Sequence, residues 1–223
     1  MNFEQARFNM IEQQIRPWDV LDSKVLALLA TMKREQFVPA AMQALAFADT
    51  ELPLGLGQTM LSPKLEARLL QAAAPTAFDT VLEIGGGTGY MAALLAQTAA
   101  QVFSYERLPE LAALAKKNLH GALCDNVHVA VGCGFELAAS AGKTWDLIVL
   151  SGSVARPDCL PASMLDSLAV GGRLVGIFGD AQTSPMQRAL RLSKQTDGAL
   201  LETFLFEACA PALEGVSAKR FAF

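Results

Sequence analysis

This sequence has few histidines, no closely spaced pair of cysteines and no long block of like charge. Each of these features excludes a class of functional site. No two of its four cysteines (Cys124, Cys133, Cys159 and Cys209) have C-x-x-C spacing, so we expect no zinc or redox motif. The net charge is −4, and no run of five like charges occurs. Because neutralising phosphates requires a basic face, a nucleic acid is not expected as the main partner.

Signals for export or membrane insertion are also missing from the sequence. The first ten residues, MNFEQARFNM, lack the apolar core of an export signal, and no segment is apolar for long enough to cross a membrane. Scattered thiols in an α/β-type chain indicate a reducing compartment, so we expect a cytoplasmic protein without a membrane partner. The hydrophobic content of 52% predicts a thick core and leaves a monomer and a homodimer open.

The first third of the chain has the spacing of helices. Apolar residues recur at roughly helical intervals over 3–15, Pro17 interrupts the pattern, and Asp22 or Ser23 can cap a second helix. In SPKLEARLLQAA (62–73), Ser62 stands at an N-cap position and Pro63 at the first helical position. We interpret residues 1–75 as a helical extension and substrate loop, which either packs on the main domain or forms a lid.

From residue 80 onward, strand patterns alternate with helix patterns. Short apolar strands are predicted at 80–84, 101–106, 126–132, 145–152 and 171–179, followed by two more strands around a turn at Asp197-Gly198. This alternation predicts an α/β fold with a doubly wound, mostly parallel, seven-stranded Rossmann-like sheet and an antiparallel C-terminal edge. Residues 76–223 are expected to form this core and, with 1–75, one structural unit.

A glycine-rich turn, LEIGGGTGY (82–90), lies where the first of these strands meets its helix. Ligands of open α/β sheets bind at such strand ends. The dinucleotide pattern G-x-G-x-x-G would require glycine where Tyr90 stands. Glu83 would repel a pyrophosphate but attract a sulfonium and an amino group. Glu106 is placed to accept hydrogen bonds from ribose hydroxyls. The turn therefore favours S-adenosylmethionine (SAM) over NAD, against the plainer alternative of a tight turn with Glu106 merely exposed.

The third strand ends in VGCGFE (131–136), where SAM enzymes often carry an acid that accepts a hydrogen bond from the adenine amino group. Here that position is Cys133, and a thiol is a poor acceptor. Either backbone groups and Phe135 hold the adenine, or Cys133 is a small buried filler. The residues expected to contact the cofactor are Thr59, Glu83, Gly85, Gly87, Gly89, Glu106, Arg107, Cys133, Gly134 and Phe135.

The order of these segments resembles the protein-L-isoaspartate O-methyltransferase family of SAM-dependent methyltransferases. The resemblance rests on MIEQQI, REQFVPA, LPLGLGQTM-SP, VLEIGGGTGY and AVGGRLV. It implies methyl transfer from SAM to a carboxylate, with isoaspartyl residues of damaged protein as acceptors, protein repair as the role and S-adenosyl-L-homocysteine (SAH) as the product. It also implies that the motif loop Gln58, Thr59, Met60 and Leu61 forms an active-site wall, with Gln58 and Thr59 near the methionine end of the cofactor.

The sequence departs from this family at the substrate side. Members typically read G-Q-T-I-S-x-P with a catalytic serine, whereas Leu61 stands at that position and Ser62 follows one residue later. No catalytic residue is therefore assigned, and we expect weak or absent activity on isoaspartyl peptides. The family's G-A-A-P run is SGSV (151–154) here, which makes Ser151 and Gly152 substrate-side candidates beside Leu61. Whether AKRFAF (218–223) is the family's C-terminal segment stays open.

No catalytic base is evident in these loops, and this bears on the acceptor. His120 ends a predicted helix, and His128 lies inside a predicted strand. A carboxylate is already ionised at neutral pH and needs no base, whereas an amine or a phenol does. We therefore favour a protein or peptide carboxylate as acceptor. A different or small-molecule acceptor and an inactive SAM-binding protein remain alternatives. No metal is expected.

Overall fold

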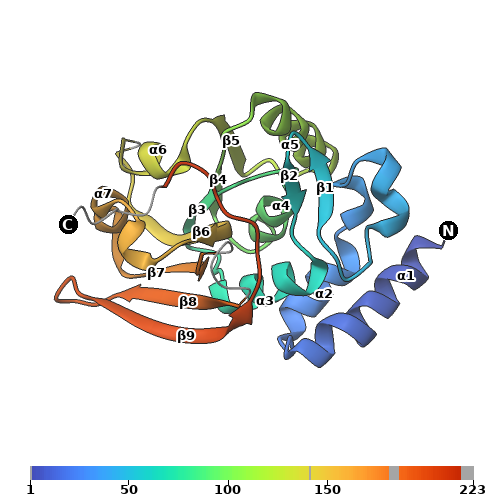
Figure 1. The fold of residues 1–223 in the computed structure, drawn as a ribbon, viewed down its shortest axis with the longest axis horizontal. Helices are drawn as coiled ribbons and strands as arrows, with labels where there is room; N and C mark the ends of the chain where they lie inside the picture. Colours follow the sequence, from blue (N-terminus) through green and yellow to red (C-terminus); the bar gives the residue numbers. More distant parts are fainter. Residues whose placement is uncertain (1, 141, 181–185, 217–223) are drawn as a thin grey trace.

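The central feature of the fold is a seven-stranded sheet (Figure 1). The structure is a computed structural model that describes residues 2–140, 142–180 and 186–216. The strand order is β5-β4-β3-β6-β7-β8-β9. The first five of these pair in parallel, whereas β8 and β9 pair antiparallel at one edge. The predicted sheet is thereby confirmed. The strands are β3 Thr80–Ile84, β4 Gln101–Glu106, β5 Val127–Val131, β6 Trp145–Val154, β7 Leu168–Phe178, β8 Gln187–Lys194 and β9 Leu200–Ala208.

Helices cover both faces of the sheet, because alternate residues of the central strands feed two separate cores. On β3, Val81 joins a core with residues of α3, α4 and α5, while Leu82 joins a second core with residues of α6 and α7. The sequence pattern alone does not predict α6. The helices are α3 Pro63–Ala73, α4 Tyr90–Ala96, α5 Pro109–Gly121, α6 Gly134–Ser140, the 3-10 turn η5 Pro157–Cys159 and α7 Ala162–Asp166.

The N-terminal region is helical, as predicted, but it is broken into short pieces. Its first helical run ends just after Pro17, where Asp19 adopts a left-handed φ of 60°. Asp22 caps the next helix by accepting hydrogen bonds from the backbone N–H of Lys24 at 2.7 Å and Val25 at 3.3 Å. The pieces are α1 Phe3–Met10, η1 Ile11–Ile15, η2 Arg16–Trp18, α2 Ser23–Thr31, η3 Arg34–Gln36 and η4 Ala40–Leu45.

The motif segment before α3 is a hairpin, whereas its sequence predicts only a loop. β1 (Leu52–Gly55) pairs antiparallel with β2 (Gln58–Met60) around a two-residue turn. Leu56 and Gly57 have φ values of 55° and 74°, as a type I′ turn requires. Ser62 occupies the N-cap position of α3, as predicted, although its side chain makes no capping hydrogen bond.

The guanidinium of Arg34 ties this hairpin to the N-terminal region and to α3. Its Nε donates to the carbonyl of Ala46 at 2.8 Å, and its Nη2 donates to the carbonyl of Leu61 at 2.7 Å. Its Nη1 pairs with the carboxylate of Glu66 on α3. Because both charged side chains are almost fully buried, each depends on the other for compensation.

Two further observations concern features expected from the sequence. AKRFAF, the candidate for the family's C-terminal segment, lies outside the described residues. Among the helices of 2–140, 142–180 and 186–216, none combines the length and the apolar character needed to cross a membrane.

The Arg34 contacts predict a large loss of stability when the cation is removed. Arg34→Met leaves the buried Glu66 carboxylate unpaired, so the free energy of unfolding should fall by about 3–5 kcal/mol in denaturant titrations. Arg16→Met is the matched control, because Arg16 pairs with Glu12 at the exposed surface and should contribute less than about 1 kcal/mol. Equal losses in the two variants would contradict the structural role of Arg34.

Candidate cofactor and acceptor site

The glycine turn between β3 and α4 forms the floor of the site. Gly85 and Gly87 have φ values of 88° and 52°, a region that glycine adopts without the steric cost of a side chain. The backbone N–H groups of Gly85 and Gly86 donate to the carbonyl of Tyr105 at 3.0 and 3.2 Å. A side chain at Gly86 would overlap the hydroxyl of Ser104. The turn is therefore held close to the strand ends, and the side chain of Leu213 packs against Gly85.

Glu83 places a buried carboxylate directly beneath this turn. Its Oε2 accepts a hydrogen bond from Ser104 on β4 at 2.7 Å, and its Oε1 accepts one from Ser151 on β6 at 2.9 Å. Burial raises the pKa of Glu83 to about 7, and the two serine hydroxyls oppose that rise. Glu83 therefore titrates near neutral pH, and a cation beside it would favour the ionised form.

Glu106, at the end of β4, is the second carboxylate of the site. It accepts hydrogen bonds from the backbone N–H of Gly87 at 2.8 Å and of Leu108 at 2.9 Å. Each carboxylate oxygen has a further lone pair, so both can still accept a hydrogen bond from a ligand hydroxyl. Glu106 thus fixes the position of the glycine turn and can also bind a ligand there.

Two clefts meet at Gly85 and contain most of the predicted site residues. The first cleft is lined by Gln58, Ile84, Gly85, Tyr105, Glu106, Arg107, Leu108, Gly132, Gly134, Leu213 and Glu214. The second cleft is lined by Leu54, Thr59, Met60, Leu61, Glu66, Glu83, Gly85, Gly86, Gly87, Thr88, Tyr90, Met91 and Ser151. The β1–β2 hairpin contributes to both clefts, so the motif segment and the glycine turn face each other.

Four predicted residues lie behind these walls instead of lining them. Gly89 is the N-cap of α4 and packs toward α5, while Phe135 is buried in the second core. Cys133 lies against Gly215, and Gly152 lies against Leu213. Contact between these four residues and a ligand stays a prediction.

The second cleft also holds polar groups that the sequence alone does not mark as site residues. Tyr90 is 2% exposed, and its hydroxyl has no hydrogen-bond partner in the structure. Burial raises the pKa of Tyr90, so this hydroxyl stays protonated and can donate to a ligand. Burial also raises the pKa of Glu66 to about 7, against the opposing effect of Arg34. No sequence motif identifies these residues as part of a site. Glu66 has the spacing of an ordinary polar residue on an amphipathic helix.

The donor and acceptor groups of the two clefts fit a cationic nucleoside. Two carboxylates, Glu83 and Glu106, flank a glycine turn, and the charge of Glu83 beneath the turn disfavours the doubly anionic pyrophosphate of NAD. A ligand with ribose hydroxyls and a positive end is complementary to them. Within residues 2–140, 142–180 and 186–216, no group of three His, Cys, Asp or Glu side chains could hold a metal ion.

Comparisons with known proteins point to one family and one fold. The family model of protein-L-isoaspartate(D-aspartate) O-methyltransferase matches residues 5–209. A protein-L-isoaspartate O-methyltransferase of Koribacter versatilis is 42% identical over 203 residues, which cover 91% of this chain and 88% of the relative. One from Picosynechococcus is 42% identical over 169 residues, covering 76% and 74% of the two chains. A Plasmodium falciparum structure solved with SAH has the same fold, with a TM-score of 0.76, 18% identity, and 96% and 99% of the chains covered.

The raised pKa of Glu83 predicts a pH dependence of stability. From pH about 5 to about 7.5 the folded protein retains a proton that the unfolded chain releases, so the free energy of unfolding should fall as the pH rises. Glu83→Gln cannot ionise and should remove about 2–3 kcal/mol of that fall. Denaturant titrations at several pH values measure it, with Glu110→Gln on the exposed face of α5 as control. A fall of unchanged size in Glu83→Gln would contradict the burial of an ionisable group at this position.

Proposed function

This chain belongs to the protein-L-isoaspartate O-methyltransferase family, and from that premise we propose that it transfers a methyl group from SAM to the carboxylate of an isoaspartyl residue in a protein or peptide. One observation carries the proposal: the two clefts adjoin at Gly85, so the glycine turn and the motif segment Gln58–Leu61 face one space. SAH is the proposed product.

The cofactor part of the proposal rests on Glu83, Glu106 and the glycine turn. When bound, SAM supplies an electrophilic methyl group on a positively charged sulfur. Ionised Glu83 stabilises the cationic methionine end, with Thr59 approaching from β2. Glu106 accepts hydrogen bonds from the ribose hydroxyls. Arg107 and Gly134 form walls at the end of the first cleft that takes the adenine base. At Gly87 an added Cβ would have only Leu54 within 4 Å, so the backbone there permits close approach of the cofactor.

The acceptor part of the proposal rests on the second cleft. The free hydroxyl of Tyr90 can donate a hydrogen bond to an acceptor carboxylate, and Arg34 neutralises the nearby Glu66. Ser151 already donates to Glu83, so its role is to orient that carboxylate. An ionised acceptor needs alignment and exclusion of water but no base. This agrees with the positions of the histidines, since neither lines the two clefts.

Leu61 affects the rate of methyl transfer at this site. Its side chain is 4% exposed and lines the second cleft, and its carbonyl is held by Arg34. The backbone is therefore fixed by Arg34 whichever side chain stands at position 61. A leucine offers no hydrogen bond to the acceptor, so alignment falls to the remaining donors.

We further propose that the protein works in the cytoplasm and that residues 1–75 and 76–223 act as one unit. Cys124, Cys133, Cys159 and Cys209 are all free, which supports a reducing compartment. The cation of Arg34 lies over the ring of Tyr90 at 4.8 Å from its centroid, and Nε of Arg173 on β7 donates to the carbonyl of Ala73 at 2.7 Å. These contacts cross the boundary between the two segments and support their joint action in binding the acceptor.

Calorimetry tests the cofactor assignment. SAH should bind with a dissociation constant at least about a hundredfold lower than that of NAD, because the pyrophosphate would meet Glu83. Glu106→Gln should weaken SAH binding about tenfold through its weaker hydrogen bonds to the ribose. Tighter binding of NAD than of SAH would refute the assignment.

A methyl-transfer assay with an isoaspartyl peptide tests the acceptor assignment. The unmodified protein should show slow turnover, and Leu61→Ser should raise kcat/KM about tenfold by adding one hydrogen-bond donor. Leu61→Ala is the matched control, since it opens a similar space without the hydroxyl and should give no such gain. If Leu61→Ser and the unmodified protein are both silent while SAH still binds, the isoaspartyl acceptor is wrong.

A further inference from the structure

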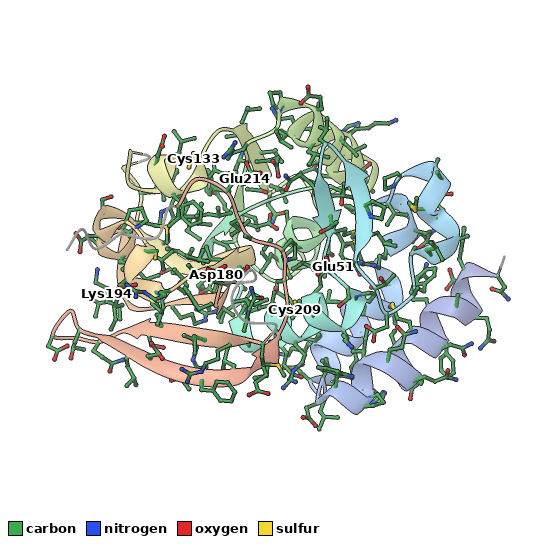
Figure 2. The ribbon with its side chains drawn as sticks, in the orientation of Figure 1. Glu51, Cys133, Asp180, Lys194, Cys209 and Glu214 are labelled. Carbon is green, nitrogen blue, oxygen red and sulfur yellow. The ribbon has the colours of Figure 1, made fainter. Side chains whose placement is uncertain are left out.

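The segment after β9, residues 209–216, forms a strap across the carboxyl ends of the parallel strands. Figure 2 shows it passing from Cys209 to Glu214, on the side of the molecule where Cys133 lies. Ser153 anchors it: its N–H donates to the carbonyl of Pro211 at 2.8 Å, and its carbonyl accepts from the N–H of Leu213 at 2.8 Å. Buried Gln187 adds a bond from the N–H of Ala210 at 2.7 Å. The strap is therefore an ordered wall of the first cleft.

The strap places a carboxylate at the base end of the first cleft. Glu214 lines this cleft together with Gly132 and Gly134, which flank Cys133 at the end of β5. Oε2 of Glu214 pairs with Nη2 of Arg107 at 3.0 Å, and Oε1 is not part of that pair. The cation thus holds the carboxylate at the cleft while one oxygen remains for a ligand.

Cys133 itself is poorly suited to bind a base. A Cβ added to Gly215 would lie 2.7 Å from its Sγ, so the strap packs directly on the thiol. Thiols are also weak hydrogen-bond acceptors. The first cleft has another carboxylate, Glu106, but it lies at the ribose end, where it accepts the backbone N–H groups of Gly87 and Leu108. The 6-amino group of an adenine would therefore find its carboxylate on the strap.

We propose that Glu214 accepts a hydrogen bond from the 6-amino group of the cofactor's adenine, with Arg107 positioning the carboxylate. This inference rests on the cofactor part of the proposed function. It makes the strap a determinant of base recognition and supplies from the C-terminal segment an acceptor that β5 lacks.

Base discrimination separates this role from that of a surface ion pair. We would titrate SAH and its 6-deamino analogue, in which hydrogen replaces the amino group, by calorimetry. The unmodified protein should bind SAH about tenfold more tightly than the analogue. Glu214→Ala should reduce this preference to less than about twofold and leave the dissociation constant of the analogue unchanged.

One further variant completes the experiment. Glu202→Ala, at an exposed position on β9, should keep the tenfold preference. Retained discrimination in Glu214→Ala, or equal weakening of both ligands, would overturn the inference. Failure of the unmodified protein to bind SAH would overturn the proposed function as well, and the two results are distinct.

Discussion

The buried guanidinium of Arg34 is the interaction on which the arrangement of the site depends. It binds the carbonyls of Ala46 and Leu61 and pairs with Glu66, so the N-terminal helices, the β1–β2 hairpin and α3 are held at one point. Its cation also lies over the ring of Tyr90, 4.8 Å from the centroid, at the start of α4. A buried charge of this kind specifies geometry more than it adds stability, because its desolvation offsets much of its attraction. Here the geometry it specifies is the position of Leu61 opposite the glycine turn.

The sheet supplies the other half of the site through the order of its central strands. β3 lies between β4 and β6, so the carboxylate of Glu83 receives hydroxyl hydrogen bonds from both neighbours, through Ser104 and Ser151. Glu106 ends β4 and holds the N–H of Gly87. Parallel strands ending at one edge therefore bring together polar groups that lie up to 68 positions apart in the chain. The C-terminal strap closes the edge and adds Glu214.

Local patterns in the sequence were sufficient to predict the sheet and the glycine turn. β3 and β4 have the bounds expected from their apolar runs, because each run ends at a turn signal that acts over a few residues. The hairpin of β1 and β2 was not predicted. Its left-handed turn position is usually occupied by Gly or Asn, which signals a hairpin, but here the residue is Leu56. The Arg34–Glu66 pair joins residues 32 positions apart, and Glu214 reaches the cleft only through the path of the strap. Such contacts depend on tertiary packing, which no short spacing in the sequence encodes.

The central claim is that a cofactor site typical of the family adjoins an acceptor cleft whose motif position is leucine. A crystal structure of the ternary complex with SAH and an isoaspartyl peptide tests it most directly. The account predicts the adenosine in the first cleft, with its ribose on Glu106, and the isoaspartyl carboxylate in the second cleft, between Leu61 and the hydroxyl of Tyr90. A peptide bound outside the second cleft, or SAH bound away from Glu83 and Glu106, would contradict it.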